Sequence, residues 1–133
     1  MILKFNLSLI SFQTSWQRRN QPKSRKKAQN ELQNRKEKLK KSKHLVADHH
    51  FGVREVVWMA LRPEIEKELD LAISFLSNWS KNEDENIRRF ATEVTRPRGV
   101  WCKHIQKLKD TPEIALPILE PLKADPSKYV QNS

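Results

Sequence analysis

Two stretches of this chain decide the fold: HFGVREVVWMALRP at residues 50–63 and NEDENIRRFATEVTRPRGVW at residues 82–101. Apolar residues recur in both at the i, i+3, i+4, i+7 spacing that marks one face of a helix. They are Val53, Val56, Val57, Ala60 and Leu61 in the first stretch, and Ile87, Phe90, Ala91 and Val94 in the second. Both predicted helices end in an Arg-Pro pair, and matching residues are 34 positions apart throughout. The chain therefore contains an internal repeat.

The same pattern begins a third time, at an offset of 43 residues. The matching residues are Leu76, Trp79 and Ile87 against Leu119, Leu122 and Val130. Proline and capping residues divide the intervening sequence into further helices. The predicted caps are Asn82 with Glu85 as its capping-box partner, Thr111, and Asp125.

Second helices are predicted between the repeats. One runs from Pro63 to about Trp79, and another from Pro112 to about Leu122, where Pro117 shortens or kinks it. A short helix is expected over residues 101–108. The inward face of the helix after Pro63 is predicted to hold Ile65, Leu69, Ala72, Ile73 and Leu76.

Helix pairs that repeat every 34–43 residues are typical of an α-solenoid of HEAT or armadillo type. The low glycine content, 2 residues in 133, favours helices over a turn-rich β-fold. We therefore expect an all-α, HEAT-like solenoid of antiparallel helix pairs over residues 47–133. A basic, partly disordered or helical N-terminal tail is expected over residues 1–46. Because each pair is covered only by its neighbours, we expect a piece of a longer solenoid that self-associates through its exposed end.

The positive charge lies in the N-terminal third. Residues 1–46 hold 13 basic and 2 acidic residues, whereas residues 47–133 hold 13 basic and 14 acidic ones. Such a basic segment attracts nucleic acid by neutralising phosphates, without sequence preference and with strong salt dependence. An inert basic tail is the alternative. The apolar start over residues 1–12 leaves two interpretations open, a targeting presequence or a short hydrophobic start.

Several classes of site are not expected. The single cysteine, Cys102, excludes an internal disulfide and a four-cysteine zinc site, and it fits a reducing, cytoplasmic location. No apolar stretch approaches the roughly 18 residues of a membrane-spanning helix. His44, His49 and His50 have no carboxylate or cysteine that completes a metal site. We expect no metal, no cofactor and no membrane partner.

The repeat region resembles the DNA alkylation-repair glycosylases of the AlkC/AlkD type, which are built from HEAT-like repeats. The resemblance is greatest to the AlkC-type branch, and it rests on a pattern of charged and aromatic residues at fixed spacing. These residues are Arg88-Arg89, Glu93, Arg96-Pro97-Arg98 and Trp101, with LPILEPLKADPSKYVQNS at residues 116–133 similar to the family's next repeat. Family members carry further repeats on both sides, so the resemblance implies an internal piece of such an enzyme.

The resemblance implies excision of N-alkylated bases such as 3-methyladenine from duplex DNA. The alkylated purine is cationic and leaves readily, so the protein must supply negative charge near the sugar and a positioned water. Glu93 is the first candidate for a catalytic carboxylate, and Glu55 is the second. The alternative for Glu93 is a structural ion pair with Arg89 or Arg96. Glu55 would also suit the start of a helix.

Four arginines are candidate DNA contacts. Arg54 and Arg88 occupy the same repeat position, so stacked repeats would align them along a DNA backbone. Arg96 and Arg98 flank a proline that would aim them at phosphates. The alternative is that these arginines bridge neighbouring repeats.

The tryptophans are expected near helix faces. Trp79 is predicted to lie in the core. For Trp101, core packing is the favoured interpretation, and stacking on a base or sugar of the DNA is the alternative.

Two functions therefore stay open at this point. One is a DNA-repair glycosylase that acts on duplex DNA with alkylated bases. The other is a non-catalytic HEAT-like binding module, with nucleic-acid affinity confined to the basic tail.

Overall fold

The computed structural model describes residues 23–133 of the chain. The two interpretations of residues 1–12 lie outside this part. The first described helix, α2 (Lys23–Val46), covers most of the predicted basic segment.

The division between compact units falls between Arg35 and Lys36, earlier than the boundary expected after residue 46. Leu39 and Val46 give the reason. Both side chains are buried in the hydrophobic core that the later helices form. The C-terminal part of α2 therefore belongs to the same unit as the repeats.

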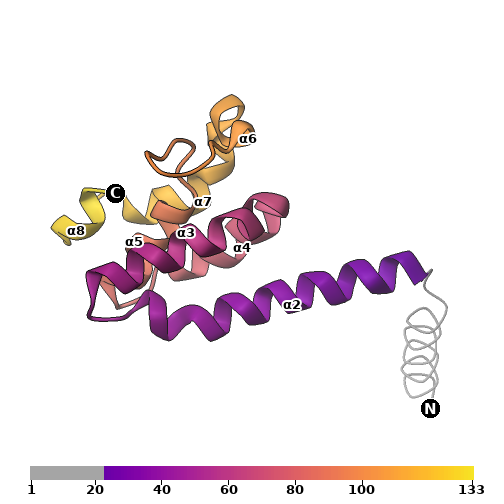
Figure 1. Ribbon diagram of the computed structural model, residues 1–133. Helices are drawn as coiled ribbons and strands as arrows, with labels where there is room; N and C mark the ends of the chain where they lie inside the picture. The colour runs from indigo at the N-terminus through magenta and orange to yellow at the C-terminus, as the bar shows by residue number, and fades with distance from the viewer. Residues whose placement is uncertain (1–22) are drawn as a thin grey trace, which may run out of the picture. The chain divides into compact units, whose positions relative to one another are not determined.

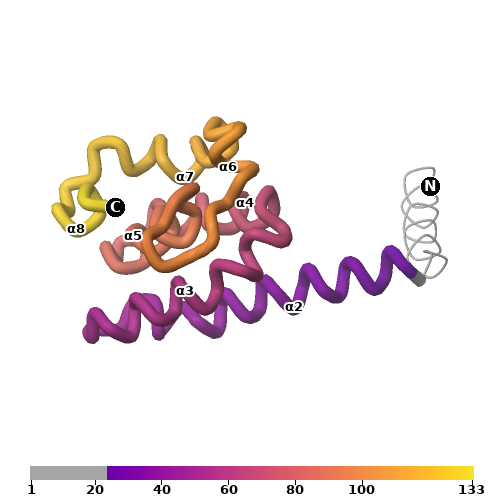
Figure 2. The backbone as a smooth tube through the Cα atoms, turned by 45° about the horizontal axis from the view of Figure 1, so that its top comes forward, coloured from indigo at the N-terminus to yellow at the C-terminus, as the bar shows by residue number. Residues whose placement is uncertain are grey.

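The remaining elements are all helical. They are α3 (Phe51–Lys67), α4 (Leu69–Trp79), α5 (Glu85–Val94), α6 (Gln106–Asp110), the 3-10 turn η1 (Pro112–Ala115), α7 (Leu116–Leu119), the 3-10 turn η2 (Glu120–Leu122) and α8 (Lys128–Gln131). Helix α3 packs against α5 and α4, α4 packs against α5 and α7, and α5 packs against α8 (Figures 1 and 2). Across residues 23–133 the only β-type pairing is an isolated bridge between Gly99 and Cys102. The predicted all-α class is confirmed.

The helix predicted from Pro63 to Trp79 is divided, because α3 runs to Lys67 and α4 begins at Leu69. All five apolar residues expected on its inward face are buried, Ile65 on α3 and the other four on α4, and all four expected on α5 are buried as well. Trp79 joins the two helices, because its ring lies 5.5 Å from the rings of both Phe75 and Phe90. Tilted aromatic pairs at this separation are favourable, and the prediction of Trp79 in the core is correct.

The predicted end of α3 is wrong, and its predicted inward face is correct only in part. The helix continues through Pro63 to Lys67 because Ile65, beyond the proline, is buried, and tertiary packing overrides the lost backbone hydrogen bond. Of the predicted face, Val57 is buried and Val53 and Leu61 pack partly buried against the core, whereas Val56 is 64% exposed and Ala60 is exposed as well. The other buried residues of α3 are Trp58, Arg62 and Ile65.

Two predicted caps lie two residues too early. Asp84, not Asn82, caps α5 by accepting from the Asn86 N–H. Ser127, not Asp125, caps α8 by accepting from the Val130 N–H.

Of the two helices predicted after residue 100, the first begins later than expected and the second is divided as expected. Residues 101–105 form turns, so the short helix begins only at Gln106. The stretch from Pro112 to Leu122 is divided into η1, α7 and η2, which agrees with the predicted effect of its prolines.

The internal repeat reappears in the hydrogen bonds before α3, α5 and α8. An Asx side chain precedes each helix and accepts from the backbone N–H two residues later. The three are Asp48, Asn82 and Asp125, at 2.7, 2.9 and 2.9 Å. Six residues further on, a side chain donates back to the carbonyl of the same Asx residue: Arg54, Arg88 and Gln131, at 2.7, 2.9 and 2.8 Å. These motifs are 34 and 43 residues apart, which are the predicted repeat lengths.

Candidate functional site

The two candidate carboxylates, which come from different helices, line one small pocket. Glu55 lies on α3 and Glu93 on α5. The pocket has a free volume of about 10 Å³, which is room for about one water molecule. Its lining is Val46, Arg54, Glu55, Asn86, Arg89, Phe90, Glu93 and Tyr129.

Glu93 is only 5% exposed and lies between two arginines of its own segment. Arg89 Nη2 lies 3.0 Å from its Oε1, and Arg96 Nη1 lies 3.5 Å from its Oε2. The Arg89 contact is an ion pair without hydrogen-bond geometry, so Oε1 has no hydrogen-bond donor among the described residues. Glu93 thus forms the ion pairs of the structural alternative, and its Oε1 is ion-paired with Arg89 but accepts no hydrogen bond from the described residues.

Glu55 is half-buried and accepts a 2.9 Å hydrogen bond from the indole Nε1 of Trp58, one turn later on α3. This contact orients the Glu55 carboxylate without neutralising it. The pocket therefore combines an ion-paired carboxylate with one held by a neutral donor.

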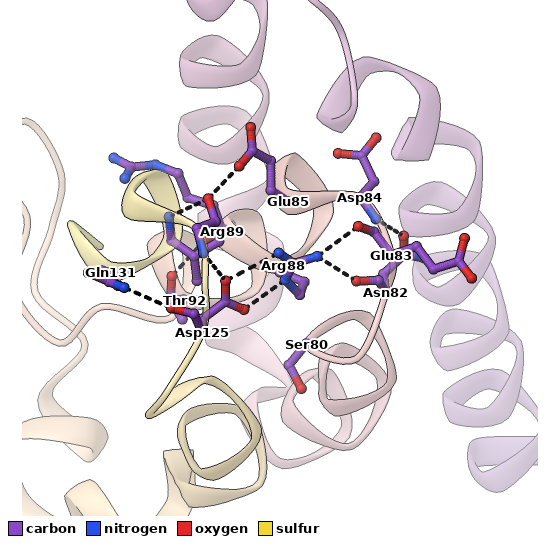
Figure 3. A network of polar contacts seen from close by, with 12 residues as sticks. Ser80, Asn82, Glu83, Asp84, Glu85, Arg88, Arg89, Thr92, Asp125 and Gln131 are labelled. Atoms are coloured by element: carbon purple, nitrogen blue, oxygen red, sulfur yellow. Dashed lines mark hydrogen bonds and ion pairs between the residues drawn. The ribbon is translucent and has the colours of Figure 1, made fainter.

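Arg54 and Arg88 are engaged inside the protein. Arg54 donates to the Asp48 carbonyl and, at 3.2 Å, to the Tyr129 hydroxyl. Arg88 donates to both oxygens of Asp125, at 2.8 and 3.2 Å, and to two loop carbonyls before α5 (Figure 3). The placement of both side chains matches the bridging alternative.

Asp125 is the most buried acid of this network, with its side chain only 4% exposed. The Arg88 hydrogen bond, the Ser127 N–H and the Arg88 charge outweigh burial and hold the pKa of Asp125 below its ordinary value. Figure 3 shows Asp125 between Arg88 and Gln131, at the junction of α5 with the segment before α8. The Arg88–Asp125 pair therefore joins the second repeat to the third.

Arg89 and Tyr129 are site residues that the sequence analysis did not assign. The Arg89 guanidinium lies over the Tyr129 ring, 4.2 Å from its centroid, and donates to the Tyr129 carbonyl. The Arg54 guanidinium lies 5.2 Å from the centroid of the same Tyr129 ring. The i, i+4 spacing of Arg89 and Glu93 was the available signal for Arg89, whereas nothing local pointed to Tyr129.

Arg62 is a further residue without a predicted role. Its guanidinium is buried, with the residue 3% exposed, and it donates only to backbone carbonyls. These are Val94 O at 3.2 Å, Arg96 O at 2.6 Å and Lys103 O at 3.1 and 3.2 Å. Val94 and Arg96 lie at the C-terminal end of α5, where free carbonyls favour a cation. Arg62 thus fastens both ends of the loop over residues 96–103 to α3.

That loop carries the remaining candidates. Arg96 and Arg98 are exposed, with the Arg96 side chain at 47%. Trp101 is 84% exposed, so the favoured prediction that it packs in the core is wrong. The loop is held by Arg62 and Ile105 instead, and it leaves the indole at the surface.

Trp101 borders an open groove of about 610 Å³ between α3 and the loop. Its lining is Met59, Arg62, Pro63, Glu66, Lys67, Trp101, Cys102 and Lys103. The exposed indole keeps the DNA-stacking alternative open.

Within residues 23–133 no three acidic, histidine or cysteine side chains gather as metal ligands would. The same part of the chain has no helix that is long and apolar enough to cross a membrane.

Comparison with known proteins gives one partial relative. An uncharacterized protein, YhaZ, from Bacillus subtilis (strain 168), is 43% identical over 74 residues, which cover 56% of this chain and 21% of the relative. The chain thus spans about a fifth of the length of the relative that it matches. No family model and no solved structure matches the chain.

Proposed function

We propose that this chain belongs to a DNA alkylation-repair glycosylase of the AlkC/AlkD type and carries part of its base-excision site. The proposal combines the resemblance around Glu93 with one structural observation. Glu93 Oε1 is buried without a hydrogen-bond donor beside a pocket with room for about one water, and Glu55 lines the same pocket. HEAT-like stacking of the helix pairs and a cytoplasmic location are parts of the same proposal.

The proposed reaction uses this pocket to hold the attacking water. The glycosidic bond of an N-alkylated purine breaks with its electron pair moving to the cationic base, and the sugar gains oxocarbenium character. The Glu93 carboxylate stabilises that positive charge and accepts the proton of the water that attacks the sugar. Glu55, which lines the same pocket, adds negative charge. The pocket is far smaller than a purine, so the nucleoside would lie at its mouth.

The exposed loop supplies the proposed DNA contacts. Arg96, Arg98 and Trp101 project from the segment that Arg62 fastens to α3. Exposed arginines suit phosphate contacts, and an exposed indole suits stacking on a base or sugar.

A second candidate is a non-catalytic HEAT-like binding module. The observation in its favour is that Glu93 lies buried between Arg89 and Arg96. Arg54 and Arg88 are also turned to internal contacts, and neither arrangement requires a substrate.

The test is release of free 3-methyladenine from methylated duplex DNA. The full chain is compared with Glu93→Gln, which keeps the side-chain volume but removes the charge. Glu83→Gln is the matched control, because Glu83 is exposed and only its backbone carbonyl makes a described hydrogen bond. Circular dichroism confirms that each variant is folded.

Release by the wild type and the control, with about 100-fold or greater loss in Glu93→Gln, is the expected result. Release that survives in Glu93→Gln would remove Glu93 from the chemistry. No release from the folded wild type would favour the non-catalytic module.

A further inference from the structure

Seven of the 13 basic side chains of residues 47–133 have an acidic partner within 4.0 Å. The pairs are Lys67–Glu64, Arg88–Asp125, Arg89–Glu93, Arg96–Glu93, Lys103–Glu66, Lys107–Asp70 and Lys123–Glu120. The arginines expected to follow a DNA backbone, Arg54 and Arg88, are among the internally engaged groups.

The C-terminal part of α2 is different. Lys38, Lys40, Lys41 and Lys43 are all exposed, and none of them has an acidic oxygen within ion-pair distance in the described part of the chain. The sequence before Glu31 contains no acidic residue either. Like charges three positions apart, as in Lys38 with Lys41 and Lys40 with Lys43, repel one another along a helix. Residues 36–43 hold five lysines and one acidic residue, Glu37, so this segment carries a net charge of +4.

The lysine segment is also held in place. Leu39 and Val46, at 7% and 0% exposure, lie in the hydrophobic core of the compact unit over residues 36–133. They therefore anchor the helix that carries the lysines. A charged group on an anchored helix loses less conformational freedom on binding than one on a free tail.

We propose that Lys38, Lys40, Lys41 and Lys43 form a sequence-independent contact to the phosphate backbone of duplex DNA. Six helical residues span about 9 Å, and duplex DNA carries about five phosphate charges over that length of its axis. The four lysines are therefore comparable in number to the phosphates along the same length of duplex. This contact goes beyond the proposed excision site, because it requires neither damaged DNA nor Glu93.

An anionic membrane surface fits this segment less well. A helix that lies on a membrane inserts an apolar face between the lipids. In this part of α2 the apolar side chains Leu39 and Val46 are already buried in the protein, and Leu45, at 38% exposure, is the one large apolar side chain at the surface. A single exposed leucine is too little for an inserted apolar face, so the lysines suit a phosphate backbone better.

The test measures binding of a fluorescent, undamaged duplex to the full chain by anisotropy, across a series of salt concentrations. The α2 variant replaces Lys38, Lys40, Lys41 and Lys43 with Gln. The control variant replaces Lys81, Lys107, Lys123 and Lys128, which are exposed and lie outside the 96–103 loop, with Gln, so both variants lose the same charge. Leu39 and Val46 are unchanged, and circular dichroism checks that α2 stays helical.

The α2 variant is expected to lose about tenfold or more in affinity at 0.1 M salt. The slope of log affinity against log salt should fall in magnitude by about 3.6, from four phosphate contacts at about 0.9 each. The control variant should keep nearly the wild-type slope.

Equal losses in the two variants would show that only net charge matters and would overturn the proposal. An absence of duplex binding by the wild type would overturn it too, as would tighter binding to phosphatidylserine vesicles than to the duplex. Equal losses in the two variants, or a preference for vesicles, would leave release of 3-methyladenine by the wild type unchanged, so this proposal and the proposed excision function can fail separately.

Discussion

Arg88 and Asp125 form a two-pronged ion pair across 37 residues of chain, with Nε–Oδ2 and Nη2–Oδ1 distances of 2.8 and 3.2 Å. The Asp125 side chain is buried, at 4% exposure, and the Arg88 side chain is largely covered, at 14%. Bidentate arginine–carboxylate pairs with such geometry are among the strongest polar contacts in proteins. The pair lies where α5 meets the segment before α8, so it holds successive repeats together.

We expect Asp125→Asn to destabilise the fold by about 2 kcal/mol or more at pH 7, because it leaves the Arg88 charge without its buried counter-ion. Urea unfolding measures the loss. Glu120→Gln is the control, since it breaks the exposed Lys123 pair, for which about 0.5 kcal/mol or less is expected. Equal effects of the two substitutions would contradict a structural role for the Arg88–Asp125 pair.

The contribution of Asp125 should disappear in acid. Its pKa in the folded protein lies below the ordinary value of 3.8, so folding favours the ionised carboxylate. This stabilisation is complete above the unfolded pKa and is lost as the pH falls through the folded pKa. The difference in unfolding free energy between wild type and Asp125→Asn should therefore shrink below about pH 4. A difference that stays constant from pH 7 to pH 2 would show that the pKa is not lowered.

Arg62→Met should cost about 3 kcal/mol or more, because it leaves the carbonyls of Val94, Arg96 and Lys103 without their buried donor. Arg62→Lys should not restore the stability, since an ammonium group cannot reproduce the planar guanidinium fork. Lys67→Met, at an exposed site on the same helix, provides the control for urea unfolding. Full rescue by lysine would mean that charge alone suffices at position 62.

Trp101→Ala and Trp79→Ala should differ sharply in stability. Trp101 is 84% exposed, so its removal should change the unfolding free energy by about 0.5 kcal/mol or less. Trp79 is buried between Phe75 and Phe90, and its removal should cost about 3–5 kcal/mol. Thermal unfolding compares the two variants, and a large loss in Trp101→Ala would place that indole in the core.

Gly99→Ala should destabilise the loop by about 1–3 kcal/mol through overpacking. A Cβ atom at position 99 would lie 2.2 Å from Cys102 Sγ, so the cysteine would have to move. Because the clash is with Sγ and not with the backbone, Cys102→Ala should remove most of the penalty. Unfolding free energies of the two single variants and the double variant test this coupling, and purely additive effects would contradict it.

Much of the fold could be read from local spacing. The apolar residues of α4 and α5 recur with a helical period and form one continuous face on each helix. Because an amphipathic helix buries its apolar face, the buried residues could be predicted. The repeat lengths of 34 and 43 residues could also be read from the sequence. The same offsets separate the Asx motifs before α3, α5 and α8. Glu55 and Glu93 were both named as candidate carboxylates, although nothing in their spacing placed them at one pocket.

The errors occur where a residue's environment is set by distant parts of the chain. Val56 follows the helical period but is exposed, because α5 and α4 cover the side of α3 that carries Val57, Trp58 and Ile65. Trp101 has an apolar ring but lies at the surface, because Arg62 holds the backbone of its loop at both ends. The spacing of apolar residues reflects neighbours within about four positions of the chain, whereas the burial of a side chain depends on which helices pack against it. In this chain that packing is held by contacts between residues about 40 positions apart, such as Arg62 with Lys103 and Arg88 with Asp125.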